Sequence, residues 1–289
     1  MKMKSLFRKF LSYSPSDLWQ NRLLLFSLLC PLPKHPQCPQ PLRSKDCCLI
    51  LANGPSANDI LPEILRRLGE FDLYTMNFAQ KSEFFFQLKS KMHILADPAF
   101  FKSTVSARVE ENRKCLAAAF RKIDWALQLA VPRQYLSAAK DMYAAPSVSL
   151  MGFPTRSTSL CAKYQKRIIQ KGYYSFGAQS VASSALYMAL MAGYKKILLA
   201  GVDADWLKTM SVDQHNKVYW FDNHHYADNP EKCYSGLSYS QEILCVARYF
   251  SELQAIHAYA DTIHAEIINL YQESMVDIFP KQVFAQIVL

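Results

Sequence analysis

The sequence predicts an α/β fold with a doubly wound, mainly parallel sheet. Short apolar runs without polar alternation recur along the chain, as in strands buried on both faces of a parallel sheet. The clearest run spans residues 47–52 and reads CCLILA. Helix-like stretches separate the runs, and such strand–helix alternation indicates helices packed on both faces of one open sheet.

The expected elements follow one another through most of the chain. Further strands are predicted at 72–77, 92–98, 125–131, 147–153, 197–203 and 267–270. Helices are predicted to begin at the turn after residue 52 and to occupy 107–123, 133–143, 178–193, 238–264 and 273–284. The segment 204–237 is rich in aromatic residues but has little periodicity, and loops of this length are usually lids or binding loops. We therefore expect a flexible lid over residues 204–237.

The first strand runs directly into Asn53-Gly54-Pro55-Ser56. Glycine permits a tight turn, Pro55 suits a first helical turn, and Ser56 or Asn58 can cap the helix that follows. A helix N-terminus at the carboxyl end of a parallel strand favours a bound phosphate. An ordinary strand-to-helix turn is the plainer interpretation of the same four residues.

Polar residues also end other predicted strands. Asn77, Asp97 and Asp203 each follow an apolar run, as Asn53 does. Because the carboxyl ends of neighbouring parallel strands meet at one edge of a sheet, we expect these side chains to lie together around a ligand crevice.

Composition and charge restrict the classes of function. The chain has 289 residues, 51% of them hydrophobic, and can bury a large core. Eight cysteines include no CxxC pair, which indicates free thiols in a reducing compartment and no zinc site. Residues 1–45 carry eight Lys or Arg against Asp17, a net charge of +7, so the other 244 residues hold only +2 of the total of +9. This distribution argues against a nucleic-acid-binding surface.

Residues 1–44 form a basic arm that ends in a linker with five prolines between positions 31 and 41. The apolar run 23–29 is too short to span a bilayer, which needs roughly 20 apolar residues. Basic and bulky apolar residues over 1–30 suit a helix lying on an anionic membrane surface, here the inner face of the cell membrane. Packing of the arm on the body of the protein or on a second subunit of a homo-oligomer is the alternative. The folded domain is predicted to span 45–289.

Several of these motifs, taken together and in order, resemble the bacterial sialyltransferases of glycosyltransferase family 42. They are Asn-Gly-Pro-Ser at 53–56, Asn77, Asp97-Pro98, Gly201-Val202-Asp203 and Asp-Asn-His-His-Tyr at 222–226. The likeness covers about 46–280 and is equally compatible with the wider group of motility-accessory and pterin-pyrophosphokinase-like proteins. It implies a Rossmann-like, GT-A-like domain that transfers sialic acid or a related sugar from a CMP-sugar, without a metal or other cofactor, to a glycan or glycolipid acceptor.

The resemblance also implies roles for individual residues. The general base would be His225, in the retained His-Tyr pair, although the family's own base position holds Asn229 here. Tyr226 and Tyr219 are the candidates that help the phosphate to leave, with Tyr234 also within reach. Asp97 stands where the family often has Asn. The expected nucleotide-binding residues are Asn53, Gly54, Pro55, Ser56, Asn77, Asp97, Ser180, Gly201 and Asp203.

Two other classes of function stay open. Asp203-Ala204-Asp205 formally reads DxD, a pattern that holds a divalent ion in many nucleotide-sugar transferases. A phosphotransferase is the other enzyme class, and it would use the turn at 53–56 and Asp203 to hold ATP and Mg. A membrane-attached interaction protein without catalysis is the non-enzyme alternative.

Overall fold

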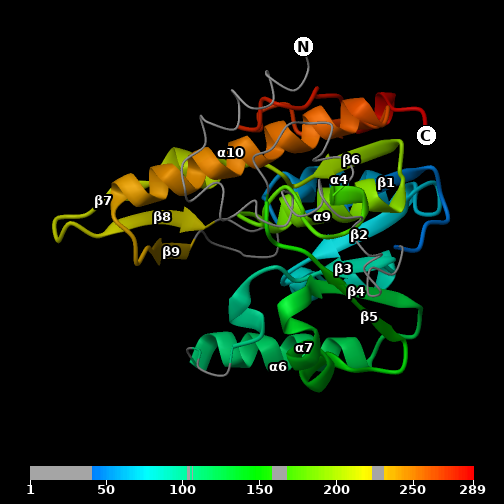
Figure 1. Cartoon of the computed structure of the whole chain (residues 1–289), viewed down its shortest axis with the longest axis horizontal. Helices are drawn as coiled ribbons and strands as arrows, with labels where there is room; N and C mark the ends of the chain where they lie inside the picture. The colour runs from blue at the N-terminus through cyan, green and yellow to red at the C-terminus, as the bar shows by residue number, and fades with distance from the viewer. Residues whose placement is uncertain (1–40, 103–104, 106, 158–167, 223–230) are drawn as a thin grey trace, which may run out of the picture.

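A computed structural model (Figure 1) describes residues 41–102, 105, 107–157, 168–222 and 231–289. Its centre is a seven-stranded sheet in the order β10-β6-β1-β2-β3-β4-β5, in which every neighbouring pair is parallel. The strands are β1 Cys47–Leu51, β2 Asp72–Met76, β3 Met92–Ile94, β4 Leu127–Pro132, β5 Val148–Phe153, β6 Lys196–Ala200 and β10 Glu266–Asn269. The predicted fold class is confirmed.

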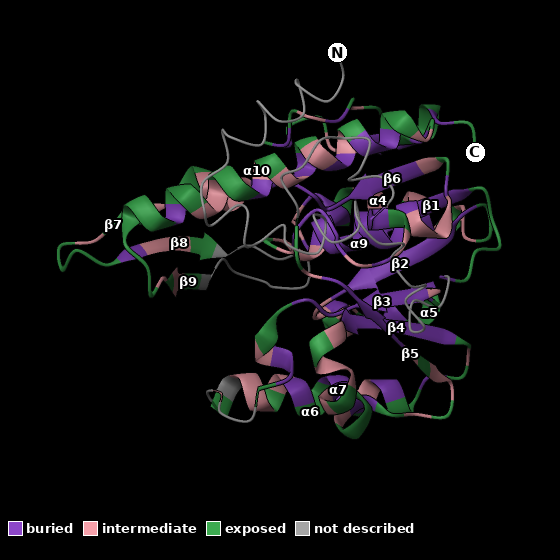
Figure 2. Ribbon diagram, in the orientation of Figure 1, coloured by how far each residue is buried: buried purple, intermediate pink, exposed green. Residues whose placement is uncertain are grey.

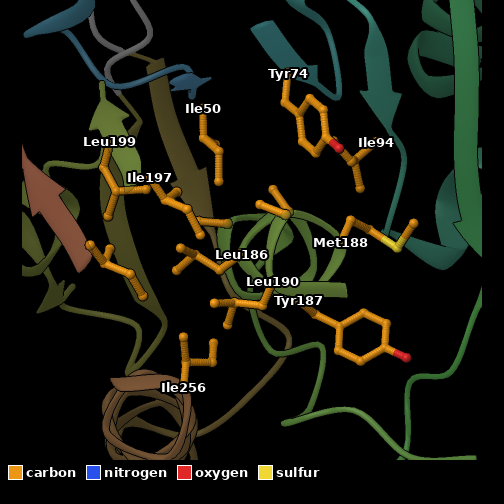
Figure 3. Close-up of a cluster of buried hydrophobic side chains, with 14 of the residues drawn as sticks. Ile50, Tyr74, Ile94, Leu186, Tyr187, Met188, Leu190, Ile197, Leu199 and Ile256 are labelled. Atoms are coloured by element: carbon orange, nitrogen blue, oxygen red, sulfur yellow. The ribbon is translucent and has the colours of Figure 1, made fainter. Parts of the chain in front are cut away.

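Helices cover both faces of this sheet. In β1, Cys47, Leu49 and Leu51 pack with α4 (Ala57–Arg66). Cys48 and Ile50 point to the other face and pack with α9 (Val181–Ala192) and α10 (Tyr239–Thr262). Figure 3 shows Leu186 and Leu190 of α9 between the strands and Ile256 of α10. The first face is completed by α6 (Ala107–Arg121) and α7 (Leu136–Tyr143). Figure 2 shows most of the central strands as buried, and burial on both faces explains their uninterrupted apolar runs.

Short elements complete the connections. They are α5 Phe85–Leu88 and the 3-10 helices η1 Ala79–Lys81, η2 Pro98–Phe100, η3 Arg133–Tyr135, η4 Asp205–Thr209 and η5 Phe284–Gln286. Among the helices of the described ranges, none combines the length and the apolar character needed to cross a membrane.

The predicted lid, 204–237, contains more regular structure than expected. Besides η4 it holds an antiparallel sheet of β7 (Ser211–Val212), β8 (Val218–Asp222) and β9 (Glu231–Tyr234). Figure 1 shows this small sheet beside the first half of α10, away from the central sheet. Valine and three aromatic residues at 218–221 favour a strand, and this signal outweighed the lack of periodicity in the whole segment.

The helix predicted at 273–284 is wrong. Pro280 has no N–H to give to a helix, and the backbone of this segment bonds to other parts of the chain instead. Met275 N donates to Asp203 O at 2.9 Å, and Asn269 N donates to Pro280 O at 2.9 Å. The terminal segment therefore braces the loop that follows β6.

The first described residues are hydrogen-bonded to the amino end of β2. Asp72 accepts hydrogen bonds from Ser44 N at 2.7 Å, from Lys45 N at 3.0 Å and from the Tyr194 hydroxyl at 2.6 Å. Burial alone would raise the pKa of Asp72, but these donors outweigh it and lower the pKa to about 2. Most of the predicted arm, residues 1–40, lies outside the described residues.

Candidate functional site

A cavity of about 380 Å³ opens at the carboxyl ends of β1, β2 and β6. The order of the sheet reverses here, because the chain passes from β1 outward to β5 and then returns to β6 on the other side of β1. Open α/β sheets bind ligands at such a switch point. The lining includes Asn53, Gly54, Asn77, Gln179, Ser180, Val181, Gly201, Asp203, Asp205, Trp206, Trp220, Glu242, Cys245 and Tyr249.

Two glycines allow the turns after β1 and β6 to interlock below this cavity. Gly54 N donates to Gly201 O at 2.9 Å, and a Cβ on Gly54 would lie 2.5 Å from that same oxygen. Gly201 has a φ of +70°, and a Cβ there would lie 2.7 Å from the carbonyl oxygen of Ala52. Any larger residue at either position would therefore push the two turns apart.

The N-terminus of α4 is occupied by a protein carboxylate. Ser56 N donates to Asp203 Oδ2 at 2.9 Å, and the Ser56 hydroxyl donates to Oδ1. The expected side-chain cap by Ser56 is absent, because its hydroxyl bonds to Asp203 instead. Burial raises the pKa of Asp203, and the hydrogen bonds from Ser56 oppose that rise. A substrate phosphate therefore needs a different binding group from the α4 terminus that the sequence suggested.

Asn53 and Asn77 present amide groups to the sheet side of the cavity. Asn53 is 8% exposed, and its Nδ2 donates to Met76 O at 3.5 Å. The Oδ1 atoms of both residues are buried and have no hydrogen-bond partner in the part of the chain that the structure describes. An unpaired buried acceptor costs free energy, which a ligand that donates a hydrogen bond would recover.

His93 holds Asn77 in place. Asn77 adopts a left-handed backbone with φ of 49°, and its carbonyl accepts a hydrogen bond from His93 Nε2 at 2.9 Å. Since Nε2 is the donor, Nδ1 is the acceptor of the Thr75 hydroxyl at 2.9 Å. Burial lowers the pKa of His93 to about 4, so the ring is neutral at physiological pH. His93 was not predicted as a site residue, although a polar residue within an apolar strand was a signal.

The N-terminus of α9 faces the cavity. Ser180 caps this twelve-residue helix by accepting from Ala182 N at 3.1 Å. Just before it, Gln179 N donates to the carboxylate of Glu252 at 3.0 Å. Burial raises the pKa of Glu252 to about 7, and the Gln179 amide opposes that rise. The α9 terminus directs the positive end of a helix dipole toward an anion in the cavity.

The opposite wall consists of residues that were not predicted individually. Trp206 of η4, Trp220 of β8, and Glu242 and Tyr249 of α10 line it. The spacing of the α10 residues could have indicated that they line one site together, since positions 242, 245 and 249 share one helix face. Tyr219 does not line the cavity: it lies on the other face of β8 from Trp220, with Lys232 Nζ 3.8 Å from its ring centre.

The structure thus brings together most of the predicted nucleotide-binding residues but not all of them. Asn53, Gly54, Asn77, Ser180, Gly201 and Asp203 line one cavity, and Ser56 contributes through Asp203. Asp97 is exposed outside it and caps η2 by accepting from Ala99 N at 2.7 Å; Pro55 also lies outside the lining. His225 and Tyr226 lie outside the described residues. Within the described ranges, no group of three or more His, Cys, Asp or Glu side chains could hold a metal ion.

The fold and the cavity together define a doubly wound α/β domain with a ligand site at its topological switch point. No family model matches the sequence, and no curated protein matches it. Among solved structures, the MAf glycosyltransferase from Magnetospirillum magneticum AMB-1 is similar, with a TM-score of 0.52 and 13% sequence identity. The match covers 88% of this chain and 36% of that one. At this identity the likeness establishes a shared fold, and this chain corresponds to only about a third of the other protein.

Proposed function

We propose that this protein is a glycosyltransferase that binds a nucleotide-activated sugar in the cavity at the switch point. The observation that carries the proposal is the pair of buried, unpartnered amide oxygens of Asn53 and Asn77 beside the α9 N-terminus. These groups suit a nucleoside that donates hydrogen bonds and a phosphate that accepts them. The fold shared with a protein described as a glycosyltransferase supports the same class of reaction.

A CMP-sugar is the proposed donor, with sialic acid or a related sugar as the group transferred. The resemblance of the site motifs to the family 42 sialyltransferases supports this choice. So does the geometry: Asp203 fills the α4 terminus, and the α9 terminus at Ser180 faces the cavity. One helix terminus suits the single phosphate of a CMP-sugar better than the chain of phosphates in ATP.

In the proposed reaction, the acceptor hydroxyl attacks the anomeric carbon, the bond from that carbon to the phosphate oxygen breaks, and a base takes the hydroxyl proton. His225 is the proposed base, with Tyr226 beside it, because histidine titrates near working pH. The amides at the α9 terminus would stabilise the departing phosphate. We propose a reaction that needs no metal. In support, both carboxylate oxygens of Asp203 already accept hydrogen bonds from Ser56, so Asp203 is poorly disposed as half of a DxD pair.

The proposed acceptor is a glycan or glycolipid at the inner face of the cell membrane, reached through the basic arm at residues 1–30. The charge of that arm supports this partner, and the arm is equally compatible with self-association.

A thermal-shift comparison of CMP, UDP, GDP and ATP tests the nucleotide class, because a ligand that binds only the folded state raises its stability. We expect the largest rise in Tm with CMP. Release of CMP from CMP-N-acetylneuraminic acid or CMP-Kdo, with and without EDTA, then tests transfer and its metal requirement. A rise with ATP and Mg alone would favour the phosphotransferase instead, and no rise with any nucleotide would contradict the proposal.

A further inference from the structure

We infer that the cavity wall opposite the sheet, formed by Trp206, Trp220 and Glu242, binds a pyranose ring. This inference rests on the proposed function, since the sheet side of the same cavity is assigned to the nucleotide. No motif in the sequence resemblance includes these three residues. They come from three elements, η4, β8 and α10, that meet only in the folded chain.

The two tryptophans form a preformed apolar surface. Their ring centres are 6.3 Å apart with planes inclined at 55°, and both side chains are half-buried and line the cavity. Thr209 fixes η4 against β8, because its hydroxyl donates to Trp206 O at 3.1 Å and its Oγ1 accepts from Phe221 N at 3.0 Å. The backbone positions of η4 and β8 are therefore set before a ligand arrives, which reduces the cost of binding.

Glu242 supplies hydrogen-bond acceptors next to this surface. It is 8% exposed, lies in the first turn of α10, and accepts a hydrogen bond from the Ser235 hydroxyl through Oε1. A carboxylate has about four acceptor sites, so capacity remains for a ligand in the cavity. Burying this charged group is costly unless donors surround it, and sugar hydroxyls are suitable donors.

The combination matches the two-sided chemistry of a pyranose, whose faces carry C–H groups and whose rim carries hydroxyls. A flat apolar ring face covers tryptophan, and the rim hydroxyls donate to carboxylate oxygens. Asp205 also lies beside Trp206 in the lining, so the carboxylate of an acidic sugar such as sialic acid must point away from this wall. The ring can be the sugar of the donor or that of the acceptor, and the two sources differ in whether the ring arrives attached to CMP.

The test compares Trp220→Ala and Glu242→Gln with two matched controls. Phe221→Ala removes the next aromatic residue of β8, which is 39% exposed and lies on the other face of the strand. Asp261→Asn removes an exposed carboxylate from the far end of α10. Calorimetry gives the Kd for CMP, for CMP-N-acetylneuraminic acid and for CMP-Kdo. Saturation-transfer NMR gives the contacts of free N-acetylneuraminic acid, Kdo, galactose and N-acetylgalactosamine with the CMP-saturated protein.

We expect every variant to bind CMP as the wild type does, which also shows that it is folded. Trp220→Ala and Glu242→Gln should each weaken binding of the sugar roughly tenfold or more, as expected for one lost hydrogen bond to a charged group or one lost aromatic contact. The controls should keep it. A loss seen with a CMP-sugar identifies the donor ring, and a loss seen only with a free sugar identifies the acceptor.

Sugar contacts that persist in both variants, or the absence of contacts with any sugar in the wild type, would overturn the inference. Failure of the proposed function is a different result: the wild type would then bind no CMP. In that case the free sugars are measured with the protein alone, and their contacts still report on the tryptophan wall.

Discussion

The carboxylate of Asp203 joins two turns that lie 147 residues apart, because it accepts both the amide hydrogen and the hydroxyl hydrogen of Ser56. Asp203 is 2% exposed and Ser56 is 3% exposed, so the contact is buried. It binds the turn after β1 to the loop after β6 at the base of the cavity. It also supplies the negative charge that the N-terminus of α4 attracts. This one contact therefore decides which helix terminus remains for a substrate phosphate.

Replacement of Ser56 by Ala removes the hydroxyl donor and leaves the buried carboxylate with the amide alone. We expect the free energy of unfolding to fall by about 1 to 3 kcal/mol, the usual cost for a buried hydrogen bond to a charged group. Urea denaturation measures this change. The control is Ser251→Ala, whose exposed hydroxyl bonds to the Ala247 carbonyl on the surface of α10. Equal stability of the two variants would show that the Ser56 hydroxyl contributes nothing to the turn.

Replacement of Gly201 by Ala combines a left-handed backbone with a clash against Ala52 O. Gly69→Ala is the matched control, because φ is +96° there and no atom lies within 4 Å of the added Cβ. The control should lose roughly 1 to 2 kcal/mol of stability from backbone conformation alone. Gly201→Ala should lose clearly more, and it should also lose nucleotide binding. Gly236→Ala, with open space around the Cβ, should be close to wild type. Urea denaturation of all three tests this order, which fails if Gly69→Ala and Gly201→Ala are equally stable.

Local sequence predicted the part of the site that depends on neighbouring residues. The apolar run 47–52 predicted β1, and the four residues after it predicted a tight turn at the carboxyl end of a buried strand, which the structure confirms. The end of α9 was predicted in the same way, since Gly193 adopts φ of 84° there. Such features follow from backbone preferences and burial within a few residues.

Features that depend on distant partners could not be predicted. Nothing near Ser56 indicates that its hydroxyl binds Asp203 instead of capping α4. The segment 273–284 has helix-like composition, but the loop after β6 and the strand β10 take up its backbone groups. The Trp206–Trp220 wall needed the register of β8, which decides that Trp220 and not Tyr219 lines the cavity.

Substitution of Asn77 tests whether the nucleotide binds at the sheet side of the cavity. Asn77→Gly keeps the left-handed backbone and removes the amide, whereas Asn216→Gly makes the same change at a residue with φ of 57° in the turn between β7 and β8. We expect Asn77→Gly to lose about 1 to 3 kcal/mol of CMP binding, roughly 5- to 150-fold in Kd, and Asn216→Gly to lose none. Asn53→Ala should resemble Asn77→Gly, because its buried amide oxygen is equally without a partner in the described chain. Calorimetry with CMP provides the measurement. Wild-type CMP affinity in both site variants would place the nucleotide elsewhere.

The basic arm tests membrane attachment. Deletion of residues 1–40 removes six Lys or Arg residues and Asp17, and we expect the shortened protein to leave vesicles of anionic lipid in a flotation assay. Raising the salt concentration should release part of the full-length protein in the same way, since ions screen the attraction. CMP binding by the shortened protein is the control for folding. If the shortened protein stays on the vesicles, another surface holds the membrane. If it loses CMP binding, the arm belongs to the folded body.

Substitution of Glu252 tests how the stability of the protein depends on pH through the carboxyl group beside the α9 N-terminus. Burial raises its pKa from 4.5 to about 7, so the folded state binds the proton more tightly than the unfolded state. The stability gained from this proton is present below about pH 4.5 and is lost as the pH rises through about 7. Glu252→Gln keeps an oxygen that can accept from Gln179 N but does not titrate. Its free energy of unfolding should therefore rise relative to wild type between pH 5 and pH 8, and urea denaturation at each pH measures the difference.

Glu266→Gln controls for loss of a charge at an exposed position. A difference between wild type and Glu252→Gln that does not change with pH would show that the Glu252 carboxyl has no raised pKa in the folded protein.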